Sequence, residues 1–186
     1  VIIGSGPNGL AAAITMARAG WEVVVHEAAD TVGGGVRSEE LTLPGFVHDV
    51  CSAIHPLGRE SPFFRDLELP VDWVQPEAPA AHPLDDGTAV TTERSLLATA
   101  ERLGEDRAAY LRLFNRVVPR WSAFEPVVLG PFPPRPNRLF HAVDPSVMRA
   151  GISSATGLAK RFQSDQARAL LAGHAAHSML PLETRP

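Results

Sequence analysis

Six residues near the start of the chain have the types and spacing of a nucleotide-binding turn. They read Gly4-Ser5-Gly6-Pro7-Asn8-Gly9, with glycine at the first, third and sixth positions. The first glycine permits a tight turn, the second lets a diphosphate approach the backbone, and the third lets the following helix pack closely on a strand. The phosphates then meet free N–H groups at the positive end of the helix dipole. Glycine-rich turns also serve as plain connections, so the flanking elements decide the interpretation.

A carboxylate follows at the distance that such a site requires. Glu27 stands 23 residues after Gly4, at the end of the second strand expected in this region. A carboxylate there can accept hydrogen bonds from both ribose hydroxyls of an adenosine, and it repels a 2′-phosphate. Glu27 therefore argues against NADP as the ligand.

The flanking residues predict the strand–helix–strand unit that would position both features. Residues 1–3 indicate a buried strand, residues 8–19 are rich in alanine and predict a helix that ends at Gly20, and residues 22–26 predict a second strand. Such a unit joins parallel strands by a right-handed crossover. Strand, glycine turn, helix, second strand and acid thus occur in the order that a dinucleotide site needs.

Turn residues and apolar spacing predict two hairpins and then helices in the rest of the chain. One hairpin is expected over residues 41–50 around Pro44-Gly45, and another over residues 80–91 around Asp85-Asp86-Gly87. Ser61 is expected to begin a short helix. Longer helices are expected from an N-cap at Thr92 to Leu103, over 105–128, over 145–162 and over 165–179, with a proline-rich connector at 130–136.

Composition and charge limit the classes of protein to consider. Hydrophobic residues make up 45% of the chain and charged residues 20%, which is typical of a globular protein. The net charge of −4 gives no reason to expect nucleic acid as a partner, and the single cysteine, Cys51, cannot form an internal disulfide. Since no apolar run is long enough to span a bilayer and no signal peptide is visible, we expect a cytoplasmic protein without a transmembrane segment. Val1 already lies in the first strand, so we expect the N-terminal fragment of a longer protein.

A second glycine-rich segment bears on the choice of cofactor. Residues 27–38 read EAADTVGGGVRS and place three glycines shortly after Glu27. Together with the first turn, and with Pro44-Gly45-Phe46 and His55-Pro56 further on, this segment resembles phytoene-dehydrogenase-like FAD oxidoreductases. These belong to a wider flavoprotein group that includes amine oxidases and phytoene desaturases. The resemblance is clear over residues 1–90 and loose over the helical part.

The resemblance implies FAD as the cofactor and a role for each matching residue. Gly4, Gly6, Pro7, Asn8 and Gly9 would line the diphosphate, and Glu27 would hold the adenosine ribose. Gly34 and Gly35 would let the backbone pass close to the phosphates and the ribityl chain, Arg37 would supply a cation, and Ser38 a hydroxyl donor. The family closes its flavin site with a further glycine-rich segment near the C-terminus, and this sequence lacks that segment. We therefore expect the chain alone to fold poorly and to bind FAD weakly.

The expected fold is α/β, with a Rossmann-like FAD-binding βαβ unit, an antiparallel insertion and part of a mainly helical substrate domain. We place the FAD-binding part at residues 1–92 and the helical part at residues 93–186. The resemblance implies that the intact protein dehydrogenates or saturates C–C bonds of a lipophilic, isoprenoid or carotenoid-like substrate. Hydride would pass to or from the flavin, with oxygen or quinone as electron acceptor. Peripheral contact with a membrane is compatible with such a substrate.

Three alternatives stay open. They are an FAD-dependent amine oxidase, a redox-neutral flavin-bound isomerase of polyenes, and an inactive truncated nucleotide-binding fragment. The sequence assigns no catalytic residue, because in such enzymes the flavin carries the redox chemistry. The substrate and the oligomeric state are equally open.

A few other residues have types that could do chemistry. His55 is more typical of a loop histidine than of a group near a flavin, and Cys51 of a small buried residue. His174 and His177 have a spacing that can hold a metal, but no third ligand is apparent, so we expect no metal site. An apolar stripe is predicted on the helix over 105–128, where it would serve as core or cover a hydrophobic substrate; it comprises Leu111, Phe114, Val118, Trp121 and Phe124.

Overall fold

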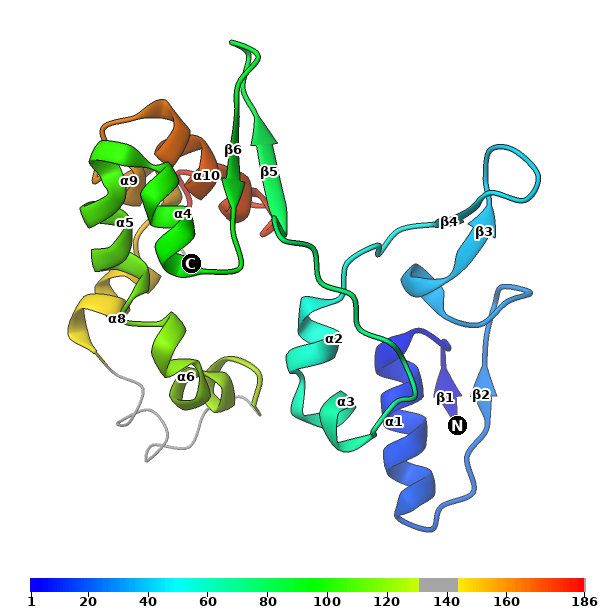
Figure 1. Cartoon of the computed structure of the whole chain (residues 1–186). Coiled ribbons are helices and arrows are strands. Elements are labelled where there is room, and N and C mark those ends of the chain that lie inside the picture. Colours follow the sequence, from blue (N-terminus) through cyan, green and yellow to red (C-terminus); the bar gives the residue numbers. More distant parts are fainter. Residues whose placement is uncertain (131–143, 186) are drawn as a thin grey trace. The chain divides into compact units, whose positions relative to one another are not determined.

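A computed structural model describes residues 1–130 and 144–185 of the chain. Helices and strands both occur, and the chain divides into two compact units, Val1–Val71 and Asp72–Pro186 (Figure 1). The predicted connector at residues 130–136 falls almost wholly outside the described residues.

The first unit begins with the predicted strand–helix–strand arrangement. Strand β1 (Ile2–Ile3) pairs in parallel with strand β2 (Val25–His26), and helix α1 (Pro7–Arg18) connects them. Proline at the first helical position suits the helix start, because its missing N–H would have no intrahelical partner there. The helix ends one residue before the predicted end, and Gly20 follows with φ 85°. The βαβ prediction is therefore confirmed, with strands shorter than expected.

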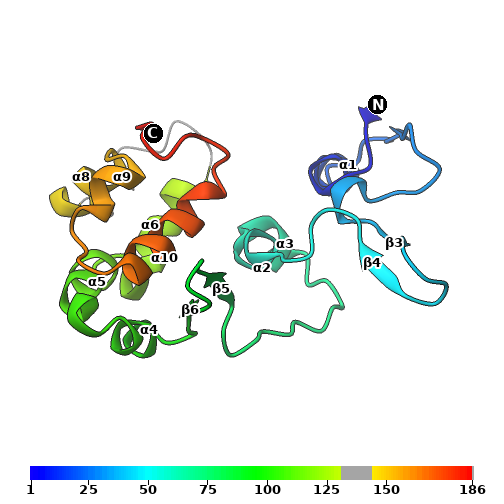
Figure 2. The ribbon, with the colours of Figure 1, turned by 90° about the horizontal axis from the view of Figure 1, so that it is seen from above.

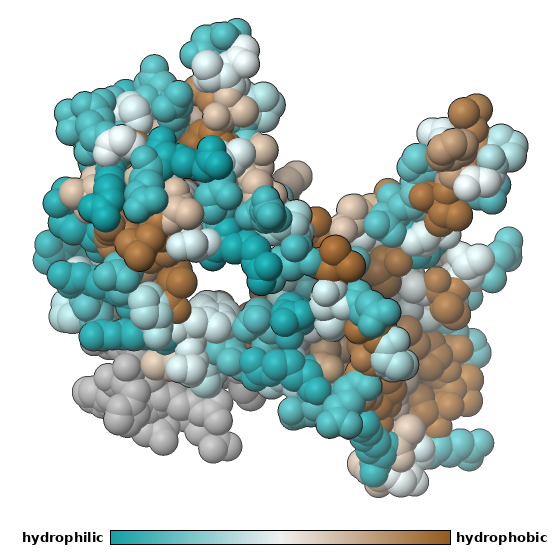
Figure 3. Space-filling view, viewed as in Figure 1, coloured by the Kyte–Doolittle hydropathy of each residue, from teal (hydrophilic) through white to brown (hydrophobic). Residues whose placement is uncertain are grey.

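The two faces of this parallel pair differ in their environment. Ile2 lies toward α1, since a Cβ placed on Gly9 would contact its side chain. Side chains alternate along a strand, so Ile3 points to the other face. The Ile3 side chain is 79% exposed, and Val24, the residue before β2, is 47% exposed. Figure 3 shows this apolar surface over the strands. Among residues 1–71 the only buried side chain is that of Ser5, so the first unit has no buried apolar core of its own.

A short 3-10 turn, a hairpin and two short helices complete the first unit. Turn η1 (Gly34–Val36) leads into strand β3 (Ser38–Glu40), which pairs antiparallel with β4 (Val47–Asp49) around the predicted Pro44-Gly45 turn. Helices α2 (Pro56–Glu60) and α3 (Pro62–Asp66) follow. Ser61 precedes α3 as predicted, whereas α2 was not expected.

The second unit combines a hairpin with helices around one apolar core. Strands β5 (Ala80–Pro83) and β6 (Ala89–Thr92) pair antiparallel around the predicted turn. Helix α10 (Asp165–Ala176) packs on α9 (Ala155–Ala159) and on both strands (Figure 2). The remaining elements are α4 (Leu96–Arg102), η2 (Gly104–Asp106), α5 (Arg107–Phe114), η3 (Val118–Arg120), α6 (Trp121–Val128) and α8 (Pro145–Gly151). The core comprises Val90, Ala100, Leu103, Tyr110, Phe162, Ala167 and Leu170.

Three helix predictions in this unit need correction. Thr92 does not cap a helix, because it is the last paired residue of β6; Ser95 caps α4 instead, and its hydroxyl accepts from the Ala98 N–H at 3.3 Å. The stretch 105–128 is broken after Phe114 into α5, η3 and α6; Pro119, in η3, lacks the N–H that would bond the Asn115 carbonyl and disfavours a continuous helix, although Pro126 lies inside α6. The stretch 145–162 is likewise two helices. Its break lies before Ser154, whose hydroxyl caps α9.

These breaks also alter the predicted apolar stripe. Phe114 faces the core of the second unit, but Val118 lies in η3 and is 52% exposed. The residues of the stripe therefore do not form one continuous face. Cys51, expected to be buried, is exposed.

The hairpin β5–β6 belongs to the second compact unit because Val90 lies in its core. The two compact units thus divide at an earlier residue than the predicted boundary between residues 92 and 93. The assignment of the two domains stays a prediction. Among the described residues, no helix has the length and apolarity needed to cross a bilayer.

Candidate functional site

The two glycine-rich segments of the first unit meet in space. The Gly33 N–H donates to the Ser5 carbonyl at 3.1 Å, so the second segment is bonded to the first turn. A Cβ placed on Gly34 would lie 3.1 Å from the Gly6 Cα, and Gly34 has φ 57°. Only glycine suits both the backbone conformation and the close approach. The crossing leaves two stretches of backbone bare of side chains, as a bound diphosphate requires.

The first turn has the geometry expected of a phosphate-binding loop. Gly4 has φ 91°, which other residues rarely adopt. A Cβ placed on Gly9 would overlap the Gly4 carbonyl oxygen, so the helix can lie this close to the strand only with glycine there. The first intrahelical bond runs from the Leu10 N–H to the Gly6 carbonyl at 2.9 Å. The N–H groups before Leu10 have no intrahelical acceptor and carry the positive end of the helix dipole.

Glu27 stands at the end of β2 and is bonded to the first turn. Its Oε2 accepts from the Ser5 N–H at 2.7 Å and from the Ser5 hydroxyl at 2.6 Å, and its Oε1 accepts from the Ala29 N–H at 3.0 Å. The Ser5 hydroxyl first, and then these backbone donors, lower the pKa of Glu27 from 4.5 to about 2. The carboxylate is therefore ionised at neutral pH. Each carboxylate oxygen can accept two bonds, so these three bonds leave one acceptor position free, on Oε1.

Removing the Ser5 hydroxyl is expected to raise the pKa of Glu27. Because the folded pKa lies below the unfolded one, the ionised Glu27 stabilises the fold above pH 4.5, and this contribution is lost as the pH falls toward about 2. In Ser5→Ala we expect the pKa of Glu27 to rise from about 2 toward 4.5 without reaching it, since the backbone donors remain. Carboxyl carbon NMR during an acid titration measures it. Thr15→Ala, which removes an exposed hydroxyl bonded to the Ala11 carbonyl, is the matched control; an unchanged Glu27 titration in Ser5→Ala would contradict the assignment.

The other predicted site residues lie beside the crossing of the glycine segments. The Arg37 guanidinium bonds Glu39 at 2.7 Å and the Gly34 carbonyl at 3.0 Å, so it holds the second segment in place. The Ser38 hydroxyl donates to Asp49 across the hairpin at 2.8 Å. Gly35 lies next to Cys51, in the segment that follows β4. The structure therefore places Gly34 against Gly6 with Arg37 bonded to Gly34, whereas Ser38 bonds across the hairpin, and both Arg37 and Ser38 already have protein partners.

Sequence reasoning missed Ser5 as a functional residue. A hydroxyl between two glycines after a strand was visible in the motif, but its partner is 22 residues away in the chain. Only the fold shows that Ser5 is 2% exposed and orients Glu27.

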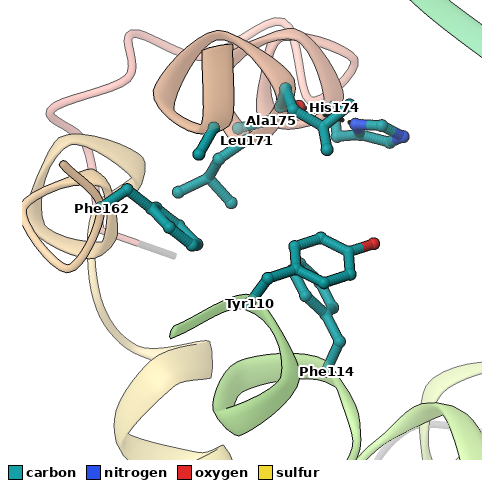
Figure 4. A pocket seen from close by; sticks show the side chains of 8 residues that line it. Tyr110, Phe114, Phe162, Leu171, His174 and Ala175 are labelled. Carbon is teal, nitrogen blue, oxygen red and sulfur yellow. Dashed lines mark hydrogen bonds between the residues drawn. The ribbon is translucent and has the colours of Figure 1, made fainter. Parts of the chain in front are cut away.

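The second unit contains an apolar cavity of about 340 Å³ between α5, α10 and the residue Phe162. Figure 4 shows side chains from α5 and α10 facing one another across it. The Tyr110 and Phe114 rings pack with centroids 4.6 Å apart, and burial raises the pKa of the Tyr110 hydroxyl. The lining comprises Tyr110, Phe114, Phe162, Ala167, Leu170, Leu171, His174 and Ala175.

His174 provides the most polar group of this cavity. Its Nδ1 lies 2.7 Å from the Leu170 carbonyl, which can only accept, so Nδ1 carries the proton. In the neutral ring, Nε2 is then an acceptor, 3.4 Å from the Thr92 hydroxyl. His82 packs edge-on against His174, with centroids 5.2 Å apart. Burial first, and then the neighbouring His174 and His177, lower the pKa of His82. Within residues 1–130 and 144–185, no three His, Cys, Asp or Glu side chains group as metal ligands.

The fold and the glycine crossing define a dinucleotide-binding unit, and comparison with known proteins agrees. Residues 2–67 match the family described as NAD(P)-binding Rossmann-like domain. The chain is also similar to one of the subunits of limonene dehydrogenase from Castellaniella defragrans, with 33% identity over 106 residues and 55% of this chain aligned. The aligned part amounts to 19% of that relative, so the chain spans only a small share of its length.

Proposed function

We propose that the chain forms the dinucleotide-binding part of an FAD-dependent oxidoreductase that acts on a lipophilic substrate. The observation that carries the proposal is the crossing of Gly6 and Gly34 beside an ionised Glu27. A single glycine turn would suit any dinucleotide. The second glycine segment adds a further stretch of bare backbone along the path that the longer FAD molecule would follow.

Each residue of the site has a stated role in this proposal. Glu27 would accept one adenosine ribose hydroxyl through its free Oε1 position and the other after exchanging a present donor, and it would reject a 2′-phosphate by charge repulsion. The loop formed by Gly4, Gly6, Pro7, Asn8 and Gly9 would hold the diphosphate on the N–H groups at the start of α1. Gly34 and Gly35 would lie against the phosphates and the ribityl chain. Arg37 and Ser38 would donate to the same region after exchanging their present partners, Glu39 and Asp49.

The bound flavin would accept or donate a hydride, while the protein would supply binding and orientation. We propose C–C dehydrogenation or saturation, as in phytoene-dehydrogenase-like enzymes, with the β3–β4 hairpin as an insertion in the nucleotide-binding domain. Two observations support a lipophilic substrate. One is the relative whose name specifies limonene, a hydrocarbon. The other is the apolar cavity in the second unit, which is largely lined by aromatic and aliphatic side chains.

Flavin binding is expected to stabilise the first unit measurably, because this unit has no buried apolar core. A ligand at a hundred times its dissociation constant stabilises the folded form by about 2.7 kcal/mol. The experiment is to record the visible spectrum and thermal unfolding of the chain, and of the longer protein, with and without added FAD. Flavin absorbance that co-purifies, with an FAD-dependent rise in the unfolding temperature, supports the proposal. Stabilisation by NAD with none by FAD would overturn it.

Anaerobic mixing of the flavin-loaded longer protein with candidate substrates then tests the substrate class. Bleaching of the oxidised flavin by a hydrocarbon such as limonene supports C–C dehydrogenation. Bleaching only by amines would favour an amine oxidase. Isomerisation of a polyene without net oxidation would favour the redox-neutral alternative.

A further inference from the structure

A second pocket, of about 280 Å³, lies on another face of α5 from the apolar cavity. Three arginines line it, one from α5, one from the turn after α5 and one from the residues after α9, together with one serine and three apolar residues. The lining comprises Ala109, Arg112, Leu113, Arg116, Ser146, Val147 and Arg161. None of these seven residues is acidic. This concentration of positive charge contrasts with the chain as a whole, whose net charge is −4.

One of the three arginines is held in place by its neighbours. The Arg116 Nη1 bonds Asp144 at 3.2 Å and donates to the Ser146 hydroxyl at 2.7 Å. Asp144 in turn accepts from the Ser146 N–H at 2.8 Å. The Asp144 carboxylate therefore neutralises Arg116 and orients it at the edge of the pocket.

The other two cations lack such compensation. Arg112 and Arg161 form no ion pair or side-chain hydrogen bond within the described part of the chain. Arg112 lies in α5, and Arg116 lies two residues past the end of that helix, so the pocket gathers cations from a helix and from the turn that follows it. Within the described residues no acidic side chain pairs with these two exposed cations, so an anion in the pocket would balance their charge.

We propose that this pocket binds a phosphate group, carried either by a small soluble molecule or by a lipid headgroup. Arginine guanidinium groups donate paired hydrogen bonds that match phosphate oxygens, and Arg112 and Arg161 have their donors free for this purpose. The remaining N–H groups of Arg116 supply further donors at the edge of the site, whereas the Ser146 hydroxyl donates to Asp144 at 2.6 Å. The inference concerns the second unit and is independent of flavin binding in the first.

The test uses the full chain and inorganic phosphate, titrated by calorimetry in a phosphate-free buffer at low salt, since screening weakens contacts of exposed charges. The pocket variant is Arg112→Gln with Arg161→Gln. The control is Arg94→Gln with Arg107→Gln, which removes the same charge from exposed positions of the second unit outside the pocket. We expect the pocket variant to bind phosphate about tenfold or more weakly, because charge-assisted bonds are lost. The control should bind like the unaltered chain.

Co-sedimentation with vesicles distinguishes the two sources of phosphate. Phosphate binding that depends on Arg112 and Arg161, without recruitment to phosphatidylglycerol vesicles, identifies a soluble ligand. Recruitment to phosphatidylglycerol but not phosphatidylcholine vesicles, lost in the pocket variant alone, identifies a headgroup. If neither probe binds, or if pocket and control variants lose affinity equally, the proposal is wrong. Since both variants leave the glycine segments intact, these outcomes are separate from the flavin test.

Discussion

Replacing Gly9 with alanine is expected to weaken FAD binding tenfold to a hundredfold. A Cβ at this position overlaps the Gly4 carbonyl oxygen, which is backbone and cannot move aside cheaply. Helix α1 must therefore shift away from β1 and carry the N–H groups of its first turn with it. Overpacking of this kind costs about 1–3 kcal/mol. If α1 must return to its native position for FAD to bind, this cost lowers the affinity for FAD roughly tenfold to a hundredfold. Fluorescence quenching of added FAD measures the dissociation constant.

Gly20→Ala is the matched control for this prediction. Gly20 also lies in the first unit and has φ 85°, but a Cβ there would meet no atom within 4 Å. Alanine should cost about 1–2 kcal/mol of backbone strain without moving the site. The aromatic side chains Tyr110 and Phe162 lie in the core of the second unit. Native spectroscopic signals from these two side chains show that the second unit of the Gly9→Ala chain is still folded. Equal FAD affinity in the two variants would mean that the glycine turn is not the binding site.

Asp106→Ala is expected to destabilise the second unit by about 3 kcal/mol, since a buried charged acceptor is removed and its donors are left unpaired. Asp106 is 1% exposed. Its Oδ1 accepts from the Gln163 N–H at 2.8 Å, and its Oδ2 from the Ser164 N–H at 2.8 Å and the Ser164 hydroxyl at 2.6 Å. One carboxylate thus joins η2 to the start of α10, the helix that lines the apolar cavity. Urea unfolding followed by circular dichroism measures the change.

The pH dependence of unfolding gives a second measure of Asp106. Burial tends to raise its pKa, but the hydrogen bonds from Ser164 and Gln163 and the charge of Arg168 prevail, and the pKa is lowered. The ionised Asp106 therefore contributes its full share to the free energy of unfolding above the unfolded-state pKa of about 3.9. This contribution is lost as the pH falls through the lower pKa of the folded state. In Asp106→Ala the free energy of unfolding should fall less steeply as the pH is lowered. Asp165→Asn, which breaks an exposed pair with Arg168, should change stability by less than about 1 kcal/mol. A comparable loss in both variants would contradict the role given to Asp106.

The features that depend on local sequence could be predicted from the sequence alone. The glycine turn, α1 and the parallel pairing of the strands follow from residue types within a short stretch, because glycine at 4 and 9 allows the positive φ and the close helix–strand approach that other residues exclude. Turn residues likewise located both hairpins, since Pro44-Gly45 and Asp86-Gly87 favour chain reversal wherever they occur. The position of Glu27 at the end of the second strand followed from its spacing from the glycine turn.

Two helix predictions failed, one because of a strand partner distant in the chain and one because of a proline within the predicted helix. Thr92 has a good capping side chain, but pairing with Ala80 keeps it in a strand. The apolar spacing over 105–128 indicated one long helix, and Pro119 breaks it within the second unit. In each case a tertiary contact or a single backbone constraint outweighs helix propensity, which is worth only a fraction of a kcal/mol per residue.

The sequence by itself determined that the chain has a dinucleotide-binding turn with a carboxylate at the proper distance. Only the tertiary structure decided that Gly34 crosses Gly6, that Ser5 holds Glu27 ionised, and that Asp106 joins η2 to α10. It also placed Arg112 and Arg161 around one pocket, although they lie 49 positions apart in the sequence. The physical reason is common to all of these. Residue types specify which groups can bond, but the choice of partner depends on which distant segments folding brings within hydrogen-bond distance.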